Sequence, residues 1–440
     1  MPPPPKKPQA SLPPPIHRFL RLSLALTVLC LFVEVFCARI LHAHYPYTWP
    51  LMPALDPFRD FYLYEPRFTF FHSPAFFTYQ GWEYLYPAPL SVVYRLFYFL
   101  PHSTECFLAT LSASFLAATI LLGRALAARG LALPSVFAIL VITVLCSYPF
   151  FFEFEQANLE FIVWIFIASG LWAFLRGRGY TAAACFGIAG AMKIFPLVFL
   201  GLFLSRRQYR ELATTLLTTA LTTLATLWLL CPNLAVSWHG TQAGVARFRE
   251  LYILRYSEVG FDHSLFALPK AMLGFSKFFT HSPTPPGPEA LARMLAVYLP
   301  LFALVGVVLY FTLIRRLPVI NQVLCLFIAS ILLPPVSYDY TLIHLYAPWA
   351  LLLLFTVETR DRFTPGLTAA FTCFAILLAP ETEIILHKHS FGGQIKAITL
   401  VALMVIALRK PFRSSYDDWF LIAQNPSDTR PSNQQTPSPE

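Results

Sequence analysis

Residues 290–314 read ALARMLAVYLPLFALVGVVLYFTLI and are followed directly by Arg315 and Arg316. An apolar run of about 20 residues is long enough to cross about 30 Å of hydrocarbon as an α-helix. Because lipid offers no partners to open backbone groups, such a run is a helix and not an open sheet. Working outward from this run, we predict nine further spans, at about residues 20–41, 106–124, 132–151, 157–175, 211–231, 318–335, 340–357, 364–380 and 392–408.

The composition of the whole chain agrees with this prediction. Of its 440 residues, 57% are hydrophobic and only 12% are charged, whereas a soluble domain is nearer to about 25% charged. The net charge of +9 is explained by basic residues at helix ends on one side of the membrane, so no nucleic-acid partner is indicated. We therefore predict an all-α polytopic membrane protein.

Basic clusters orient the predicted spans. If the N-terminus is inside, the arginine and lysine clusters after the spans all fall on the cytoplasmic side, as the positive-inside rule requires. Both termini are then cytoplasmic, and residues 43–105 and 232–289 form long outside loops. This predicts three parts: a Pro-rich cytoplasmic tail (1–18), a single transmembrane domain (19–410) and a disordered cytoplasmic tail (411–440).

Residues 180–204 break the simple alternation of spans. The segment is apolar, but arginines precede it and follow it, so both of its ends are expected on the cytoplasmic side. We predict a hairpin or re-entrant segment with Lys193 and Pro196 at its middle, near the outer side. Irregular backbone at this depth requires protein or a water-filled cavity around it. Two short helices here would bring the total from ten to about twelve.

Polar side chains gather at the outside ends of the predicted helices. Ionisable groups near hydrocarbon are functional candidates by default, because lipid makes them expensive. The candidates are Asp56, Asp60, Gln156, Asn158, Asp262, His263, Asp339 and His344. Simpler roles are open for some of them: Asp60 could cap an interfacial helix, and His344 could be a hydrogen-bonded core histidine. The basic residues of the second outside loop could form a solvated face, and they are Arg247, Arg249 and Arg255.

One chemistry would use these groups together. An anionic lipid-linked donor needs Lys or Arg for its phosphate, and Lys193 is a candidate for that contact. An acceptor hydroxyl needs a carboxylate base within hydrogen-bond reach. Aromatic residues such as Tyr86 could pack on a sugar ring or a polyprenyl tail. The eight cysteines show no CxxC spacing, so neither a zinc site nor a disulfide framework is indicated, and we expect no metal or cofactor.

Short motifs lie in a defined order along residues 20–410. Their sequences are Asp60-Phe61-Tyr62-Leu63-Tyr64, Tyr84-Leu85-Tyr86-Pro87-Ala88-Pro89, Glu155-Gln156-Ala157-Asn158, Ala191-Met192-Lys193-Ile194-Phe195-Pro196, Asp262-His263-Ser264-Leu265 and Pro335-Val336-Ser337-Tyr338-Asp339-Tyr340. In order and topology they resemble glycosyltransferase family 87, polyprenyl-phosphate-mannose-dependent enzymes of the GT-C superfamily. The chain departs from the family pattern at four places: Glu155 replaces a glycine, Ala88 interrupts a proline pair, Asp262-His263 replaces Asn-Gln, and Tyr340 replaces a histidine.

The resemblance implies a GT-C-type fold with about ten to twelve transmembrane helices. It also implies an integral-membrane enzyme that transfers a hexose, mannose by family, from a polyprenyl phosphate to an acceptor hydroxyl on the outer face. Asp60 would be the general base of an inverting single displacement, and Lys193, Arg247, Arg249 and Arg255 would bind the donor phosphate. The sugar and acceptor pocket would contain Asp56, Tyr86, Gln156, Asn158, Asp262, His263, Asp339 and His344.

The expected partners are the polyprenyl-phosphate sugar, a glycolipid, glycan or other hydroxyl acceptor, and the lipid bilayer of a bacterial plasma membrane. Two other classes of protein stay open. A transporter or flippase for a lipid-linked or anionic solute would use the same Lys193 and outside carboxylates as a translocation path. However, transporters need gates on both faces, and the polar groups of this chain concentrate on one. A non-catalytic scaffold would leave these polar groups without a purpose.

Overall fold

The computed structural model describes residues 12–40, 57–80, 84–256, 259–280, 287–359, 365–380 and 392–413. These residues form helices joined by turns. Within them, the one pairing of extended backbone is an isolated antiparallel bridge between Asp262 and Tyr338. The predicted all-α class is confirmed.

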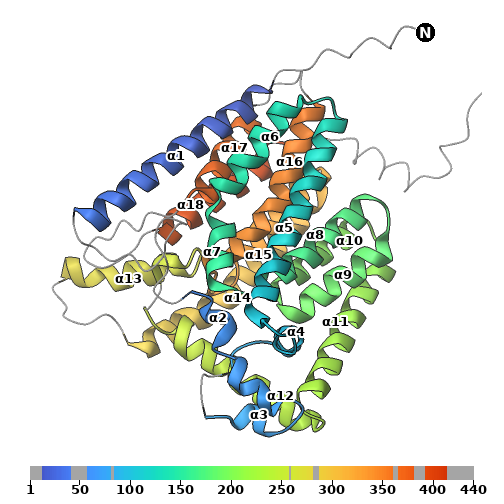
Figure 1. The fold of residues 1–440 in the computed structure, drawn as a ribbon, viewed down its shortest axis with the longest axis vertical. Helices are drawn as coiled ribbons and strands as arrows, with labels where there is room; N and C mark the ends of the chain where they lie inside the picture. Colours follow the sequence, from blue (N-terminus) through green and yellow to red (C-terminus); the bar gives the residue numbers. More distant parts are fainter. Residues whose placement is uncertain are drawn as a thin grey trace, which may run out of the picture.

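Long apolar helices form the body of the molecule (Figure 1). Six described segments are long and apolar enough to cross a membrane, and they are Pro14–Val33, Ser103–Ala128, Tyr209–Leu230, Pro288–Arg316, Asp339–Glu358 and Gly392–Arg409. A seventh results if Leu133–Val144 and Tyr148–Gln156, which meet at a bend of 48°, form one broken span. The chain is thus a polytopic helical membrane protein.

Five shorter apolar helices complete the body, and they are Glu160–Leu175, Gly179–Met192, Phe195–Ser205, Val319–Leu332 and Gly366–Leu378. Each has only 10–17 residues, less than the about 20 that a full crossing needs. The predicted ten to twelve crossings therefore exceed the six or seven helices of full length in the described residues. In Val319–Leu332, every residue except Ala329 is buried, so protein surrounds this short helix.

In chain order, the helices of the body are α1 (Pro14–Arg39), α5 (Ser103–Ala128), α6 (Leu133–Leu145), α7 (Tyr148–Gln156), α8 (Glu160–Leu175), α9 (Gly179–Met192), η2 (Phe195–Phe199), α10 (Leu200–Ser205), α11 (Tyr209–Leu230), α14 (Pro288–Thr312), η5 (Ile314–Arg316), α15 (Val319–Leu332), η6 (Asp339–Leu345), α16 (Tyr346–Glu358), α17 (Pro365–Leu378) and α18 (Gly392–Arg409). α1 packs on α17, α17 on α18, and α18 on α15. α9 packs on both α8 and α11.

The hairpin expected at residues 180–204 is present. α9 runs to Met192, Lys193 follows in extended backbone, η2 packs back on α9, and α10 continues from η2. Small residues allow α9 to pack tightly on α11: a Cβ at Gly187 would lie 2.6 Å from the Thr218 side chain. Close approach through small residues is a common way for apolar helices to associate. This packing fixes the position of the C-terminal end of α9, which Lys193 follows directly.

Short helices gather at one end of the body, which we call the loop end (Figure 1). They are α2 (Arg59–Tyr62), η1 (Glu65–Phe70), α3 (Ala75–Thr78), α4 (Ala88–Tyr98), α12 (Leu234–Phe248) and the π-helical turn η3 (Arg249–Ile253). Nearby in the chain, η4 (Val259–Phe261) leads into α13 (Ala267–Thr280). The loop end therefore comes from both predicted long loops.

An aromatic core holds the loop end together. Phe61 is fully buried and contacts the rings of Tyr94, Tyr98 and Phe107 at centroid distances of 4.8–5.7 Å. Such tilted and edge-on pairs add to the stabilisation from burial. Burial also raises the pKa of Tyr84 to about 12. Many aromatics of this segment thus pack against one another, and they fix the backbone next to Asp60.

Candidate functional site

Asp60 lies on the one-turn helix α2, which neighbouring segments anchor. The N–H of Phe58 donates to the carbonyl of Glu155 at 2.6 Å, and the hydroxyl of Tyr98 donates to the carbonyl of Phe61. The helix starts after Phe58, so Asp60 is not its N-cap. Its carboxylate instead accepts a hydrogen bond across the fold from Asn158, with 2.6 Å between Nδ2 and Oδ2. The simple capping role for Asp60 is therefore not what the structure shows.

Asn158 is held in one orientation by the start of α8. Its Oδ1 accepts from the backbone N–H of Glu160 at 3.1 Å, so its amide nitrogen points the other way. That nitrogen donates to Asp60 and, at 3.2 Å, to the hydroxyl of Tyr86. The next N–H of α8, on Phe161, donates to the buried carboxylate of Glu153 at 2.9 Å. The first N–H groups of a helix lack partners within it, and here they fix the amide beside Asp60.

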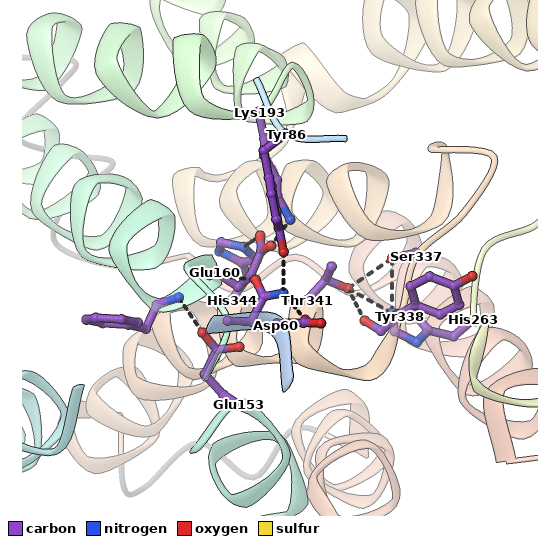
Figure 2. A network of polar contacts seen from close by, with 12 residues as sticks. Asp60, Tyr86, Glu153, Glu160, Lys193, His263, Ser337, Tyr338, Thr341 and His344 are labelled. Carbon is purple, nitrogen blue, oxygen red and sulfur yellow. Dashed lines mark hydrogen bonds and ion pairs between the residues drawn. The ribbon is translucent and has the colours of Figure 1, made fainter. Parts of the chain in front are cut away.

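Lys193 carries its ammonium to the same region from the turn after α9. Its Nζ forms an ion pair with Glu160 Oε2, and the ring of Tyr340 lies 5.0 Å away. Glu160 is fully buried, and its other oxygen is 2.6 Å from Nε2 of His344. We call Asp60, Asn158, Glu160, Lys193 and His344 the cavity cluster. Figure 2 labels four of these residues, Asp60, Glu160, Lys193 and His344, together with Tyr86 and Glu153.

A cavity of about 460 Å³ lies in front of this cluster. Asp60 and Lys193 both line it, together with Tyr86, Gln156 and Tyr340. Its remaining wall is largely apolar and includes Leu63, Tyr64, Val245, Phe248, Tyr252 and Phe261. Ligand sites commonly combine such a volume with an apolar lining and a few polar groups. The cavity can thus hold a partly apolar ligand between a carboxylate and an ammonium.

A second polar cluster joins the segment after η4 to residues 335–341. Asp262 Oδ1 accepts from the backbone N–H groups of Ser264 and Ser337, both at 2.9 Å. Burial raises the pKa of the Asp262 carboxyl, and these two hydrogen bonds oppose that shift. Nε2 of His263 lies 3.1 Å from the hydroxyl of Ser337 and 3.0 Å from that of Thr341. The contacts with Ser337 and Thr341 are visible in Figure 2.

Asp339 ties this second cluster to the helix bundle. The hydroxyl of Tyr148 on α7 donates to Asp339 Oδ2 at 3.2 Å. Lys396 on α18 and Nδ1 of His263 lie 3.6 and 3.5 Å from Asp339 Oδ1. We call Asp262, His263, Asp339 and Lys396 the junction cluster. All four side chains are buried, and none of them lines the cavity.

The predicted pocket residues therefore fall into different places. Tyr86 and Gln156 line the cavity. Asn158 does not line it but donates a hydrogen bond to Asp60, which does. His344 is fully buried against Glu160, which agrees with the hydrogen-bonded core histidine left open above. Asp262, His263 and Asp339 belong to the junction cluster, and their contact with a ligand remains a prediction. Asp56 lies outside the described residues.

The three arginines proposed for phosphate do not line the cavity. Arg247 forms an ion pair with Glu250 at 2.8 Å, and Arg249 and Arg255 are exposed. Their neighbours Val245 and Phe248 do line it, so α12 turns an apolar face to the cavity. A role of the arginines in donor binding remains a prediction.

Sequence reasoning missed Glu160 and Lys396. A signal for both was present, because each is an ionisable residue within a predicted apolar span, and such residues are functional candidates by default. Glu160 also follows Asn158 by two residues, at the start of the span. In the described residues, no three His, Cys, Asp or Glu side chains form a group that could hold a metal ion.

The family comparison adds to this geometry. Residues 84–252 match the model of Glycosyltransferase family 87. This match supports glycosyltransferase family 87 for the segment that it covers. The matched segment is less than half of the chain; it contains Asn158, Glu160 and Lys193, whereas Asp60 and the junction cluster lie outside it. No curated protein and no solved structure gives a significant match.

The match to family 87 and the apolar helices together indicate a membrane glycosyltransferase. Such an enzyme uses a sugar donor and an acceptor within a lipid bilayer. Part of the cavity wall, including Lys193 and Tyr86, lies inside the matched segment. Asp60 is connected to that region through Asn158.

Proposed function

We propose that this protein is a family 87 enzyme that transfers a hexose, mannose by family expectation, from a polyprenyl phosphate to an acceptor hydroxyl. The observation that carries the proposal is that Asp60 and Lys193 line one cavity of about 460 Å³. A transfer from a lipid phosphate to a hydroxyl needs a base on one side of the sugar and a cation on the other. These two residues come from distant segments and supply that pair.

Asp60 acts as the general base. As the acceptor oxygen attacks the anomeric carbon, the carboxylate takes its proton, and the bond from that carbon to the phosphate oxygen breaks. The polyprenyl phosphate leaves with the bonding electrons, and the anomeric configuration inverts. Asn158 orients the carboxylate through its hydrogen bond to Oδ2. A base must be held within hydrogen-bond reach of the proton it removes, and α2 and Asn158 provide that.

Lys193 stabilises the leaving group. Negative charge grows on the phosphate as the glycosidic bond breaks, so a preplaced cation lowers the barrier more than it strengthens binding of the ground state. The ammonium is at the cavity wall, where its side chain is 18% exposed. The apolar wall formed by Val245, Phe248 and Tyr252 suits the first isoprene units of the tail. Tyr86, Gln156 and Tyr340 are left to contact the sugar.

The proposed membrane orientation follows from the basic residues. Arg206 with Arg207, Arg315 with Arg316, and Arg409 with Lys410 follow α10, α14 and α18, and the positive-inside rule puts them in the cytoplasm. The loop end and its cavity then face outward from a plasma membrane. The division into an N-terminal tail, a single transmembrane domain and a C-terminal tail is part of this proposal, with α1 beginning at Pro14, inside the segment predicted as the N-terminal tail.

The proposal is tested with membranes that contain the protein and radiolabelled polyprenyl-phosphate-mannose. We expect label to appear in a new product in wild-type membranes and in a Glu65→Gln control, since Glu65 is an exposed carboxylate of the same loop that does not line the cavity. Membranes with Asp60→Asn are expected to give none. Movement of intact donor across the bilayer without a product would instead indicate a transporter and would refute the proposal.

A further inference from the structure

A fully buried carboxylate stands directly behind the lysine of the cavity wall. Glu160 is the first residue of α8 and has no exposed side-chain surface. Its Oε2 pairs with Lys193, and its Oε1 lies 2.6 Å from Nε2 of His344 (Figure 2). Lys193 lines the cavity and Glu160 does not. Both carboxylate oxygens are thus engaged inside the protein, and the lysine is between the carboxylate and the ligand space.

The Lys193 ammonium is carried by a flexible side chain beside this carboxylate. Lys193 comes after the end of α9 in extended backbone, with φ −144° and ψ 143°. A lysine head is a point charge on a flexible four-carbon stem, so backbone position alone does not fix it. The rings of Phe195 and Tyr340 lie 6.0 and 5.0 Å from the ammonium and limit its sideways movement. Glu160 supplies the ionic contact.

The Glu160 carboxylate also lowers the net positive charge at the place where the donor phosphate would bind. Glu160 and Lys193 together are neutral, so an anionic phosphate approaches a lysine whose charge is already balanced. This arrangement weakens attraction for the ground state but keeps a cation where new negative charge develops. Glu160 also donates its backbone N–H to Asn158, which in turn donates to Asp60. Residues 158–160 therefore contact both Asp60, through Asn158, and Lys193, through Glu160.

We infer that Glu160 is a positioning residue, which holds the Lys193 ammonium at the place where the leaving phosphate gains its charge. This inference rests on the proposed function, because it needs a donor phosphate at Lys193. His344 supports the carboxylate from the opposite side. Glu160 itself touches no substrate and acts through the lysine.

The first test is the kinetics of Glu160→Gln in purified, reconstituted protein with polyprenyl-phosphate-mannose as donor. Glutamine has the same size but lacks the charge that holds the ammonium. We expect kcat to fall about 10- to 100-fold, since small misplacement of a catalytic group has effects of this order. We expect the donor KM to stay equal or to decrease, because the site gains one positive charge. A kcat within about twofold of wild type, measured per folded molecule, would overturn the inference.

A double-mutant comparison separates positioning from a purely structural role. If Glu160 acts through the lysine, adding Glu160→Gln to Lys193→Met leaves kcat within about twofold of Lys193→Met alone. Equal losses in both backgrounds would overturn the inference. The double variant removes both charges of the pair and leaves no unbalanced ion. The kcat of each variant is measured per folded molecule, so a loss of stability in either single variant does not enter the comparison.

A binding experiment separates failure of this inference from failure of the proposed function. Nanodiscs with wild-type protein are titrated with polyprenyl phosphate and, for comparison, with uncharged polyprenol. No preference for the phosphate would reject the donor assignment and the inference together. With a preference that Lys193→Met abolishes, the kinetics of Glu160→Gln decide the inference alone. Glu358→Gln is the matched control, because Glu358 pairs with Arg129 at 2.6 Å away from the cavity, and we expect its kinetics to equal those of wild type.

Discussion

The cavity cluster and the junction cluster contain the same kinds of side chain in similar pairs. Each has a lysine beside a buried carboxylate, with Lys193 on Glu160 and Lys396 on Asp339, and each carboxylate also faces a histidine. The difference is access: Lys193 and Asp60 line the cavity, whereas the junction side chains are buried among three or more chain segments. A buried ionic group alone therefore does not mark a ligand site. Contact with an open cavity distinguishes the two clusters.

Of the substitutions that compare the two clusters, Lys193→Met is expected to have the largest effect after Asp60→Asn. Removing the cation of the cavity cluster should lower kcat/KM for polyprenyl-phosphate-mannose by about 10²- to 10³-fold, a loss typical for one electrostatic contact to developing charge. Steady-state kinetics on reconstituted protein measure it. The triple variant with Arg247, Arg249 and Arg255 changed to alanine should lose less, because these side chains do not line the cavity. A larger loss in the triple variant than in Lys193→Met would indicate that the arginines, and not Lys193, bind the donor phosphate.

The two lysines should differ in their effect on turnover, because only Lys193 lines the cavity. Lys396→Met leaves Asp339 with less compensation in a buried setting, and breaking a buried pair typically reduces the free energy of unfolding by about 3–5 kcal/mol. Thermal unfolding in detergent should show this loss, while kcat per folded molecule stays within about twofold of wild type. If kcat fell as far as in Lys193→Met with no change in unfolding, the junction cluster would belong to the active site.

A smaller kinetic effect is expected from Asn158→Ala. The substitution removes the hydrogen bond that orients Asp60, and we expect kcat to fall about 10- to 100-fold with little change in the donor KM. Asn321→Ala is a matched control, because Asn321 is a fully buried asparagine that bonds the carbonyls of Ala407 and Lys410 away from the cavity. The control should lose stability but not turnover. Equal kinetics for the two variants would remove Asn158 from the site.

The smallest effect should come from Asp262→Asn in the junction cluster. An asparagine keeps an oxygen for the N–H groups of Ser264 and Ser337 and removes a buried charge. Because burial raises the pKa of Asp262, its contribution to stability is fully present below the unfolded pKa of about 3.9 and is lost as pH rises through the higher folded value.

Relative to wild type, the Asp262→Asn variant should therefore gain stability as pH rises from about 4 toward 7. Denaturant unfolding across this range measures the difference. A variant that lost stability with rising pH, compared with wild type, would contradict the assigned direction of the pKa. A large loss of transfer activity would support the pocket role predicted for Asp262 from sequence.

The sequence predicted the elements well because their signal is local. The length of each apolar run located the helices, and the arginines on both sides of 180–204 revealed the hairpin that carries Lys193. The lengths of the helices were less predictable. Val319–Leu332 is a short helix that is buried in protein, and hydropathy alone does not distinguish a buried apolar helix from a membrane span.

Side-chain placement in the site was only partly predictable. Asp60 and Lys193 were singled out from the sequence. The sequence did not show that Asp262, His263 and Asp339 are buried, because their burial depends on how the segment after η4 packs against residues 335–341. Residues 337–341 illustrate this: Tyr340 lines the cavity, and its neighbour Asp339 does not. Glu160 was missed because its role depends on a residue 33 positions later.

The most direct test of the central claim is single-turnover transfer by Asp60→Asn, with donor binding measured on the same preparation. Asparagine keeps the shape and the contact with Asn158 but cannot accept the proton. We predict donor affinity within about threefold of wild type and a transfer rate lowered by at least about 10³-fold, from the loss of general base catalysis. A transfer rate within about tenfold of wild type would contradict Asp60 as the base and, with it, the account of the cavity.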